Sequence, residues 1–155
     1  MTPTTLQALR RLLFFSIQEA AQYIAEPPAS EQQWHEWENG VKPVPDQVSQ
    51  RMQVLADWRS TALAATADNI RQQIKEKGGI PEAVFILWYE RLEDWTSLPR
   101  REPVMWRIQQ SVCAGLLGMF RTVRPVAFNS SAYFLWLNDR QDSESSRAEW
   151  ASTIQ

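Results

Sequence analysis

The sequence has very little of the two residue types that form most structural zinc sites. Cys113 and His35 are its only cysteine and its only histidine in 155 residues. One cysteine cannot form an intramolecular disulfide, and one cysteine with one histidine cannot complete a four-ligand zinc site. We therefore expect no metal, no cofactor, a reducing cytoplasmic environment and a buried, unreactive Cys113.

Long apolar runs are also missing. No stretch approaches the roughly 20 apolar residues that a membrane-spanning helix needs. The apolar segment near the N-terminus carries Arg10 and Arg11 in its middle, which excludes the apolar centre of a signal peptide. We expect a protein that makes no membrane contact.

An excess of positive charge is absent as well. The chain has 16 Lys and Arg against 18 Asp and Glu, a formal net charge of −2. Neutralisation of phosphates supplies much of the affinity for nucleic acids, so a nucleic-acid-binding chain of this composition must gather its cations on one face. Aromatic residues, by contrast, are abundant. With eight tryptophans, large aromatic side chains should dominate the core or an interface.

Apolar spacing predicts a first helix that is capped by Thr4 or Thr5 and runs to about residue 15. Ser16 and Glu19 then form a capping box, in which each side chain satisfies a backbone N–H group of the other residue. This pattern predicts a second short helix from Ser16. Two consecutive prolines at 27 and 28 cannot continue a helix and mark a turn.

A third helix is predicted between Ser30 and Asn39. Ser30 and Gln33 form a second capping box, and Gly40 stands where a left-handed helix end is needed. Trp34 and Trp37 are three residues apart on one face, which favours burial in the core. Two helices joined by a turn and packed on a first helix are typical of a helix-turn-helix, whose third helix enters the major groove of DNA.

The rest of the chain predicts a mainly α protein with a small α+β part. A long helix runs from about residue 46 toward 77, as one helix or as two with a break near residues 66–68. After Gly78 and Gly79 we expect a strand at 83–89, a loop, a helix at 104–121, a strand at 123–128 and a helix at 131–137. We expect a helix-turn-helix domain at 1–66, a small α+β domain at 80–138 and a polar, mobile tail at 139–155.

The third predicted helix carries polar side chains opposite its tryptophans. Glutamine can bond adenine through N6 and N7, and a carboxylate can accept a hydrogen bond from cytosine N4. The candidate base-reading residues are Glu31, Gln32, Gln33, His35 and Glu36. The candidate phosphate contacts are Arg10, Arg11, Ser16, Ser30, Lys42 and Arg51.

The segment from Ser16 through Ala20-Ala21, followed by Trp37-Glu38-Asn39-Gly40 and Pro43, resembles the Cro/xenobiotic-response-element class of helix-turn-helix regulators. Trp34, the Val44-Pro45 pair and residues 104–112 narrow the resemblance to the YdiL-like group with the anti-CRISPR-associated autorepressors. The resemblance implies a lambda-repressor-like domain followed by a dimerisation domain. It also implies a homodimeric repressor that binds a pseudo-palindromic operator in double-stranded DNA, and a structural role for Glu38. The turn at 25–29 is longer than usual for the class, and Glu31 and Glu36 would repel phosphates.

Small residues recur along the predicted helix at 104–121. Ser111, Gly115 and Gly118 form a flat stripe that would let another helix approach closely, since glycine inside a helix needs a packing reason. With Trp106, they are candidates for a two-fold dimer interface. The alternative is close packing within one subunit, against the strand at 83–89.

Catalysis has little support. No nucleophile is paired with a base, and no glycine-rich loop with a lysine could hold a phosphate. The remaining alternative to a DNA-binding regulator is a protein-interaction module, for example an antitoxin-like protein with weak or no DNA binding. An RNA-binding regulator is a third reading, for which the sequence offers no aromatic stacking platform.

Overall fold

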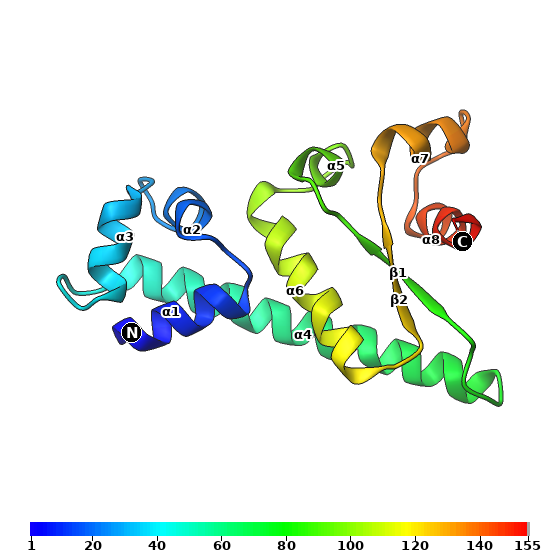
Figure 1. Cartoon of the computed structure of the whole chain (residues 1–155), viewed down its shortest axis with the longest axis horizontal. Helices are drawn as coiled ribbons and strands as arrows, with labels where there is room; N and C mark the ends of the chain where they lie inside the picture. The colour runs from blue at the N-terminus through cyan, green and yellow to red at the C-terminus, as the bar shows by residue number, and fades with distance from the viewer. Residues whose placement is uncertain (155) are drawn as a thin grey trace.

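The computed structural model describes residues 1–154 and is mainly helical, as predicted, with eight helices and two strands in that range. α1, α2 and α3 gather at one end of the long helix α4, and the sheet with α7 and α8 lies toward the other (Figure 1). The elements are α1 (Pro3–Leu12), α2 (Ile17–Tyr23), α3 (Glu31–Glu38), α4 (Asp46–Glu76), β1 (Val84–Trp88), α5 (Leu92–Thr96), α6 (Pro103–Met119), β2 (Val123–Ala127), α7 (Ser130–Leu137) and α8 (Glu144–Thr153).

The starts of α2 and α3 follow from local sequence. Both predicted capping boxes are present, with Ser16 and Glu19 at α2 and Ser30 and Gln33 at α3. The prediction for α1 was wrong at both ends. Thr2 caps it and Pro3 is its first residue. The first N–H groups of a helix have no partner within the helix, so a proline at this position costs no hydrogen bond. It ends at Leu12, before residues that bend into the turn leading to α2.

The long helix α4 is unbroken through residues 66–68, so the one-helix alternative is correct. It ends at a glycine that adopts the left-handed conformation, Gly78 at φ +70°. Gly40 after α3 does the same at φ +72°. A residue with a Cβ atom would be strained in this conformation, which is why these two glycines end helices.

The two strands form a parallel pair in which Val84 lies opposite Val123 and Trp88 opposite Ala127. Parallel strands need a crossover connection, and α5 and α6 supply it. Each outer edge of this sheet has fewer free backbone groups for a further strand than a regular edge. Alternate residues of β2 direct their backbone groups toward β1, and the nitrogen of Pro125 faces the other way. Because proline has no N–H group, the outer edge of β2 lacks a hydrogen-bond donor at this position. On the other side, α6 side chains donate hydrogen bonds to the carbonyls of Leu87 and Tyr89.

Three groups of buried side chains make up the core. The first joins α1–α4 and includes Val104 and Ile108 of α6, the second joins both strands with α5–α8, and the third lies between α4, α6 and the strands. An ion pair of 2.9 Å between Arg107 and Glu19 also ties α6 to α2. Because α6 takes part in all three groups, it packs the N-terminal helices against the rest of the molecule.

The segment expected to be a mobile tail is instead structured, and that prediction was wrong. Residues 144–153 form α8, which buries Trp150 and Ala151. Arg147 anchors the helix through two hydrogen bonds of 2.9 Å to Asp142. The many polar residues of this segment lie on its outer side, so composition alone concealed one buried aromatic residue and one buried ion pair.

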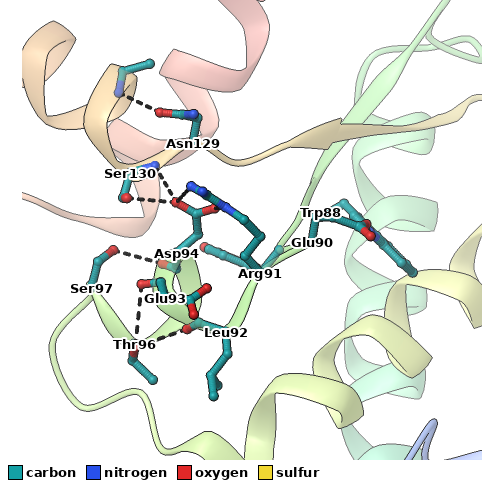
Figure 2. A network of polar contacts seen from close by, with 12 residues as sticks. Trp88, Glu90, Arg91, Leu92, Glu93, Asp94, Thr96, Ser97, Asn129 and Ser130 are labelled. Carbon is teal, nitrogen blue, oxygen red and sulfur yellow. Dashed lines mark hydrogen bonds and ion pairs between the residues drawn. The ribbon is translucent and has the colours of Figure 1, made fainter.

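Part of the predicted loop between β1 and α6 is instead the helix α5, which holds a polar network that reaches α7 (Figure 2). Asp94 is buried at 2% exposure and accepts hydrogen bonds from Arg91 and from the backbone and side chain of Ser130, at 2.7–3.1 Å. Burial alone would raise the pKa of Asp94, but these hydrogen bonds outweigh it and hold the pKa below its ordinary value. Asp94 thereby satisfies the first backbone N–H group of α7, beside the N-cap residue Asn129.

This network predicts a pH-dependent contribution to stability. Because the folded-state pKa of Asp94 is below its unfolded value near 3.8, its contribution is complete above that value. It is lost as the pH falls through the folded-state pKa. We expect Asp94→Asn to lower the free energy of unfolding in urea more at pH 7 than at pH 3. An equal loss at both pH values would contradict this role.

Candidate DNA-binding surface

The inner face of α3 is fixed in the core by two tryptophans. Trp34 is fully buried and Trp37 nearly so, with their rings 5.5 Å apart in an edge-on arrangement. The expected burial of both residues is confirmed. A helix of eight residues is too short to be stable alone, so this packing sets its position and leaves its opposite face to solvent.

A buried ion pair fixes the end of α3 to α1. Arg10 donates to both carboxylate oxygens of Glu38, at 2.6 and 3.0 Å, and to the carbonyl of Phe15 at 3.0 Å. The indole of Trp34 donates to the same carboxylate at 2.8 Å. Burial would raise the pKa of Glu38, but these partners outweigh it and lower the pKa. The structural role expected for Glu38 agrees with this geometry.

Arg10 was also predicted to contact phosphate, and the structure does not support that prediction. Its side chain is only 10% exposed and its donors are directed at Glu38 and at a backbone carbonyl. A phosphate could reach Arg10 only after this buried pair had been broken. Its position in the sequence explains the burial, because Arg10 shares the inner face of α1 with Leu6 and Leu13.

The outer face of α3 presents the predicted base-reading residues to different degrees. Glu31, Gln32, Gln33 and His35 are exposed, whereas Glu36 is partly buried. The carbonyl oxygen of Gln33 accepts a hydrogen bond from the backbone of Ser30 at 2.9 Å, so this side chain is partly committed to the capping box. Lys42 forms an ion pair of 2.6 Å with Glu36 and lowers the pKa of that carboxyl. His35 is the neutral side chain with the most freedom to contact a base, because Gln32 donates a hydrogen bond to the Glu36 carboxylate and helps to lower its pKa.

Among the predicted phosphate contacts, Arg11 is exposed and makes no ion pair within residues 1–154. Lys42 and Arg51 are exposed and face Glu36 and Glu26, at 2.6 and 3.9 Å. The pair of Arg51 and Glu26 is exposed on both sides and contributes little, so a phosphate could replace Glu26 there. Glu36 is only 21% exposed, so it competes more strongly with a phosphate for Lys42. Ser16 and Ser30 lie at the starts of α2 and α3, where backbone N–H groups and the helix dipole favour an anion.

Three of the four residues predicted for a dimer interface are used inside the subunit. Trp106 and Ser111 are buried, and a Cβ atom on Gly115 would lie 2.9 Å from Leu63. The small residues therefore admit α4 of the same chain, rather than a second subunit or the strand at 83–89. Gly118 is exposed with no atom near its missing Cβ atom, so it alone remains available for such a contact.

Within residues 1–154 there is no cluster of three His, Cys, Asp or Glu side chains that could hold a metal ion. The same residues contain no helix that is both long enough and apolar enough to span a membrane. Burial raises the pKa of the Cys113 thiol to about 12, which keeps it protonated at neutral pH.

Sequence reasoning missed the contacts that connect distant segments. Arg59 donates hydrogen bonds to Ser111, which in turn donates to the carbonyl of Leu12, so α4, α6 and the end of α1 meet at one point. Arg107 with Glu19 is a second such contact. The buried pair of Arg10 and Glu38 is a third. Only Arg10 carried a recognisable signal in the sequence, namely its place on the apolar face of α1.

The short helices α2 and α3 are joined by a turn and pack with α1 and α4, and a part with helices and two strands follows them. Residues 1–121 match the Aca2/YdiL-like family, and the chain belongs to it. It is 32% identical over 115 residues to the Aca2 repressor of Pectobacterium phage ZF40, covering 74% of this chain and 90% of that protein. It is also 32% identical over 120 residues to the uncharacterized protein YdiL of Escherichia coli K12, covering 75% and 92%.

Proposed function

We propose that this protein is a sequence-specific DNA-binding transcriptional regulator. In this proposal, residues 1–66 form a lambda-repressor-like DNA-binding unit and α3 reads the major groove. Residues 80–138 form a dimerisation unit, and the homodimer represses its own promoter by covering a pseudo-palindromic operator. The observation that carries the proposal is the fixed orientation of α3, whose inner face is buried and whose outer face is polar. The name of the phage repressor, a relative at 32% identity, supports repression.

The charges around α3 favour recognition over strong non-specific binding. Glu31 at the start of the helix repels phosphate, and Lys42 is partly neutralised by Glu36. Arg11 and the N-termini of α2 and α3 remain as anion contacts. We therefore expect modest affinity for random DNA and a larger share of the binding energy from base contacts than in a basic repressor.

The proposal is tested by replacing the two exposed, neutral base-reading side chains that lie outside the capping box, Gln32 and His35. We expect Gln32→Ala/His35→Ala to lose about 1–3 kcal/mol of operator affinity for each specific base contact removed. Affinity for scrambled DNA should stay unchanged, because phosphate contacts are retained. Gel-shift titrations on both DNAs measure the two effects, with Gln50→Ala on α4 as an exposed control. Equal losses on both DNAs would contradict base reading by α3.

A phosphate contact has a different signature. We expect Arg11→Ala to weaken binding to all sequences alike and to reduce the slope of log K against log salt by about 0.9, the effect of one phosphate contact. The charge-matched control is Arg121→Ala, because Arg121 is also exposed and follows the C-terminal end of α6. An unchanged slope for Arg11→Ala would remove this residue from the DNA surface.

The dimer contact is proposed around Gly118, next to an exposed apolar patch of Trp88, Leu117, Pro125 and Ala127. We expect Gly118→Leu to leave the monomer fold intact, because open space surrounds the missing Cβ atom. If the patch lies in a two-fold contact, the added side chain should raise the dimer dissociation constant in sedimentation equilibrium. An unchanged dissociation constant would place the dimer contact elsewhere.

The second candidate function is a protein-interaction module. It is favoured by exposed apolar side chains on α4, namely Val54 and Trp58, at 63% and 47% exposure. A partner-binding surface needs such a patch, whereas a base-reading surface does not. Loss of partner binding in Trp58→Ser, together with no operator binding by the unaltered protein, would select this function.

A further inference from the structure

A cavity of about 350 Å³ lies between α4, β1, α6 and α8, well away from α3. Its walls are largely apolar and aromatic, with Trp58 and Ala62 from α4, Phe85 and Leu87 from β1, and Trp95 from α5. This volume is at the lower end of the range of small-molecule sites, about 300–1,000 Å³, and such sites combine apolar walls with a few polar groups.

One guanidinium at this cavity has unused hydrogen-bond donors. Arg101 lies 4.4 Å above the ring of Trp95, which holds it in place, and its Nη2 atom donates to Glu144 at 3.0 Å. The Nε and Nη1 atoms of Arg101 have no hydrogen-bond partner among residues 1–154. A cation that is positioned by an aromatic ring and only partly paired is suited to binding a carboxylate.

Glu144 does not compete strongly for Arg101. Its carboxylate is 84% exposed and already has a second cationic partner, Arg147, at 2.7 Å. If Arg101 turned toward a ligand, Glu144 would keep both its solvent and Arg147. Replacing Glu144 by the carboxylate of a ligand at Arg101 therefore leaves neither Glu144 nor Arg101 without a partner.

We propose that this cavity binds a small aromatic carboxylate, with the ring between the walls of α4 and β1 and the carboxylate on Arg101. The proposal goes beyond DNA binding and does not depend on it. At this location the ligand would touch α4 and α6. These two helices also pack against the N-terminal helices.

The test measures binding of 2-naphthoate to the full chain by isothermal titration calorimetry, without DNA. The neutral analogue 2-naphthalenemethanol should bind at least about tenfold more weakly, since it cannot form the charge-assisted hydrogen bonds. Arg101→Gln should weaken 2-naphthoate by a similar factor, with the neighbouring exposed Arg100→Gln as its control. In NMR spectra, the ligand should shift the indole N–H signals of Trp58 and Trp95.

A second variant separates ligand binding from effects on folding. Ala148 is an exposed residue of α8 that lines the cavity, so Ala148→Phe should fill it and abolish binding while the protein stays folded. Ser145→Phe, on the same helix but outside the lining, is the control and should bind normally. No binding of 2-naphthoate, or binding that survives both Arg101→Gln and Ala148→Phe, would overturn the proposal. A cavity covered by a second copy of the chain would also overturn it, and would appear as a dimer that Ala148→Phe dissociates.

Discussion

Replacing Glu38 with alanine is expected to lower the free energy of unfolding by about 3–5 kcal/mol, the usual cost of removing one partner from a buried ion pair. The carboxylate is the shared acceptor of Arg10 and the Trp34 indole, and its side chain is only 2% exposed. Without it, a guanidinium and an indole N–H remain buried with fewer partners. The melting temperature should fall by about 2–4 °C for each kcal/mol in a chain of this length.

The matched control for Glu38→Ala is Glu31→Ala, at the exposed start of the same helix. It should change stability by less than about 1 kcal/mol, because it breaks no buried contact. Urea unfolding followed by tryptophan fluorescence measures both variants. Equal stability of the two would mean that Glu38 does not hold α3 against α1, and the fixed orientation of α3 would lose its explanation.

Replacing Trp150 with alanine should be comparably destabilising, by about 3–5 kcal/mol, the usual range for a buried large aromatic side chain. Trp150 is 2% exposed and its ring lies 5.4 Å from Phe128 and 5.8 Å from Tyr133, both in edge-on contact. The substitution would leave a cavity between α8, α7 and the end of β2. Calorimetry of the full chain measures the loss.

An apolar residue on the neighbouring helix gives the control. Leu135 of α7 is 82% exposed, so Leu135→Ala should change stability by less than about 0.5 kcal/mol. If Trp150→Ala were equally mild, α8 would not be part of the folded core. The earlier expectation of a mobile tail would then describe the protein in solution better than the packed helix does.

Features encoded by neighbouring residues were predictable from the sequence. The capping boxes at Ser16 and Ser30 and the glycine ends of α3 and α4 each depend on residues within one helical turn. The parallel strands followed from short β-branched and aromatic runs between helical segments. Their parallel pairing could be recognised only from the structure, because it depends on how α6 crosses between them.

Features encoded by distant residues were not predictable. Arg10 and Glu38 are 28 positions apart, so the sequence does not show that they form a pair. Arg10 therefore resembled a phosphate contact, although its guanidinium is buried against Glu38. The stripe of Ser111, Gly115 and Gly118 shows the same difficulty. Ser111 and Gly115 lie against α4 of the same chain, whereas Gly118 has open space beside it. Spacing alone could therefore not tell which small residue another helix approaches, or whether that helix is α4 or belongs to a second subunit.

The segment at 139–155 shows how composition can mislead. Its serines and acidic residues resemble those of a flexible tail, yet Arg147, Trp150 and Ala151 recur at three and four positions on one helical face. The same periodicity argument that identified the earlier helices applies here. The periodicity is hard to recognise, because a single tryptophan among polar residues raises the mean hydropathy of the segment very little.

The most direct test of DNA recognition is fluorescence anisotropy of the full protein on DNA from upstream of its own gene. The titration would cover a salt series and include scrambled DNA as competitor. We predict binding at least about 10³-fold tighter to the upstream DNA than to the scrambled DNA, with affinity that falls as salt rises but less steeply than for a basic repressor. Equal binding to both DNAs, or none at low salt, would contradict the proposal and favour the protein-interaction module.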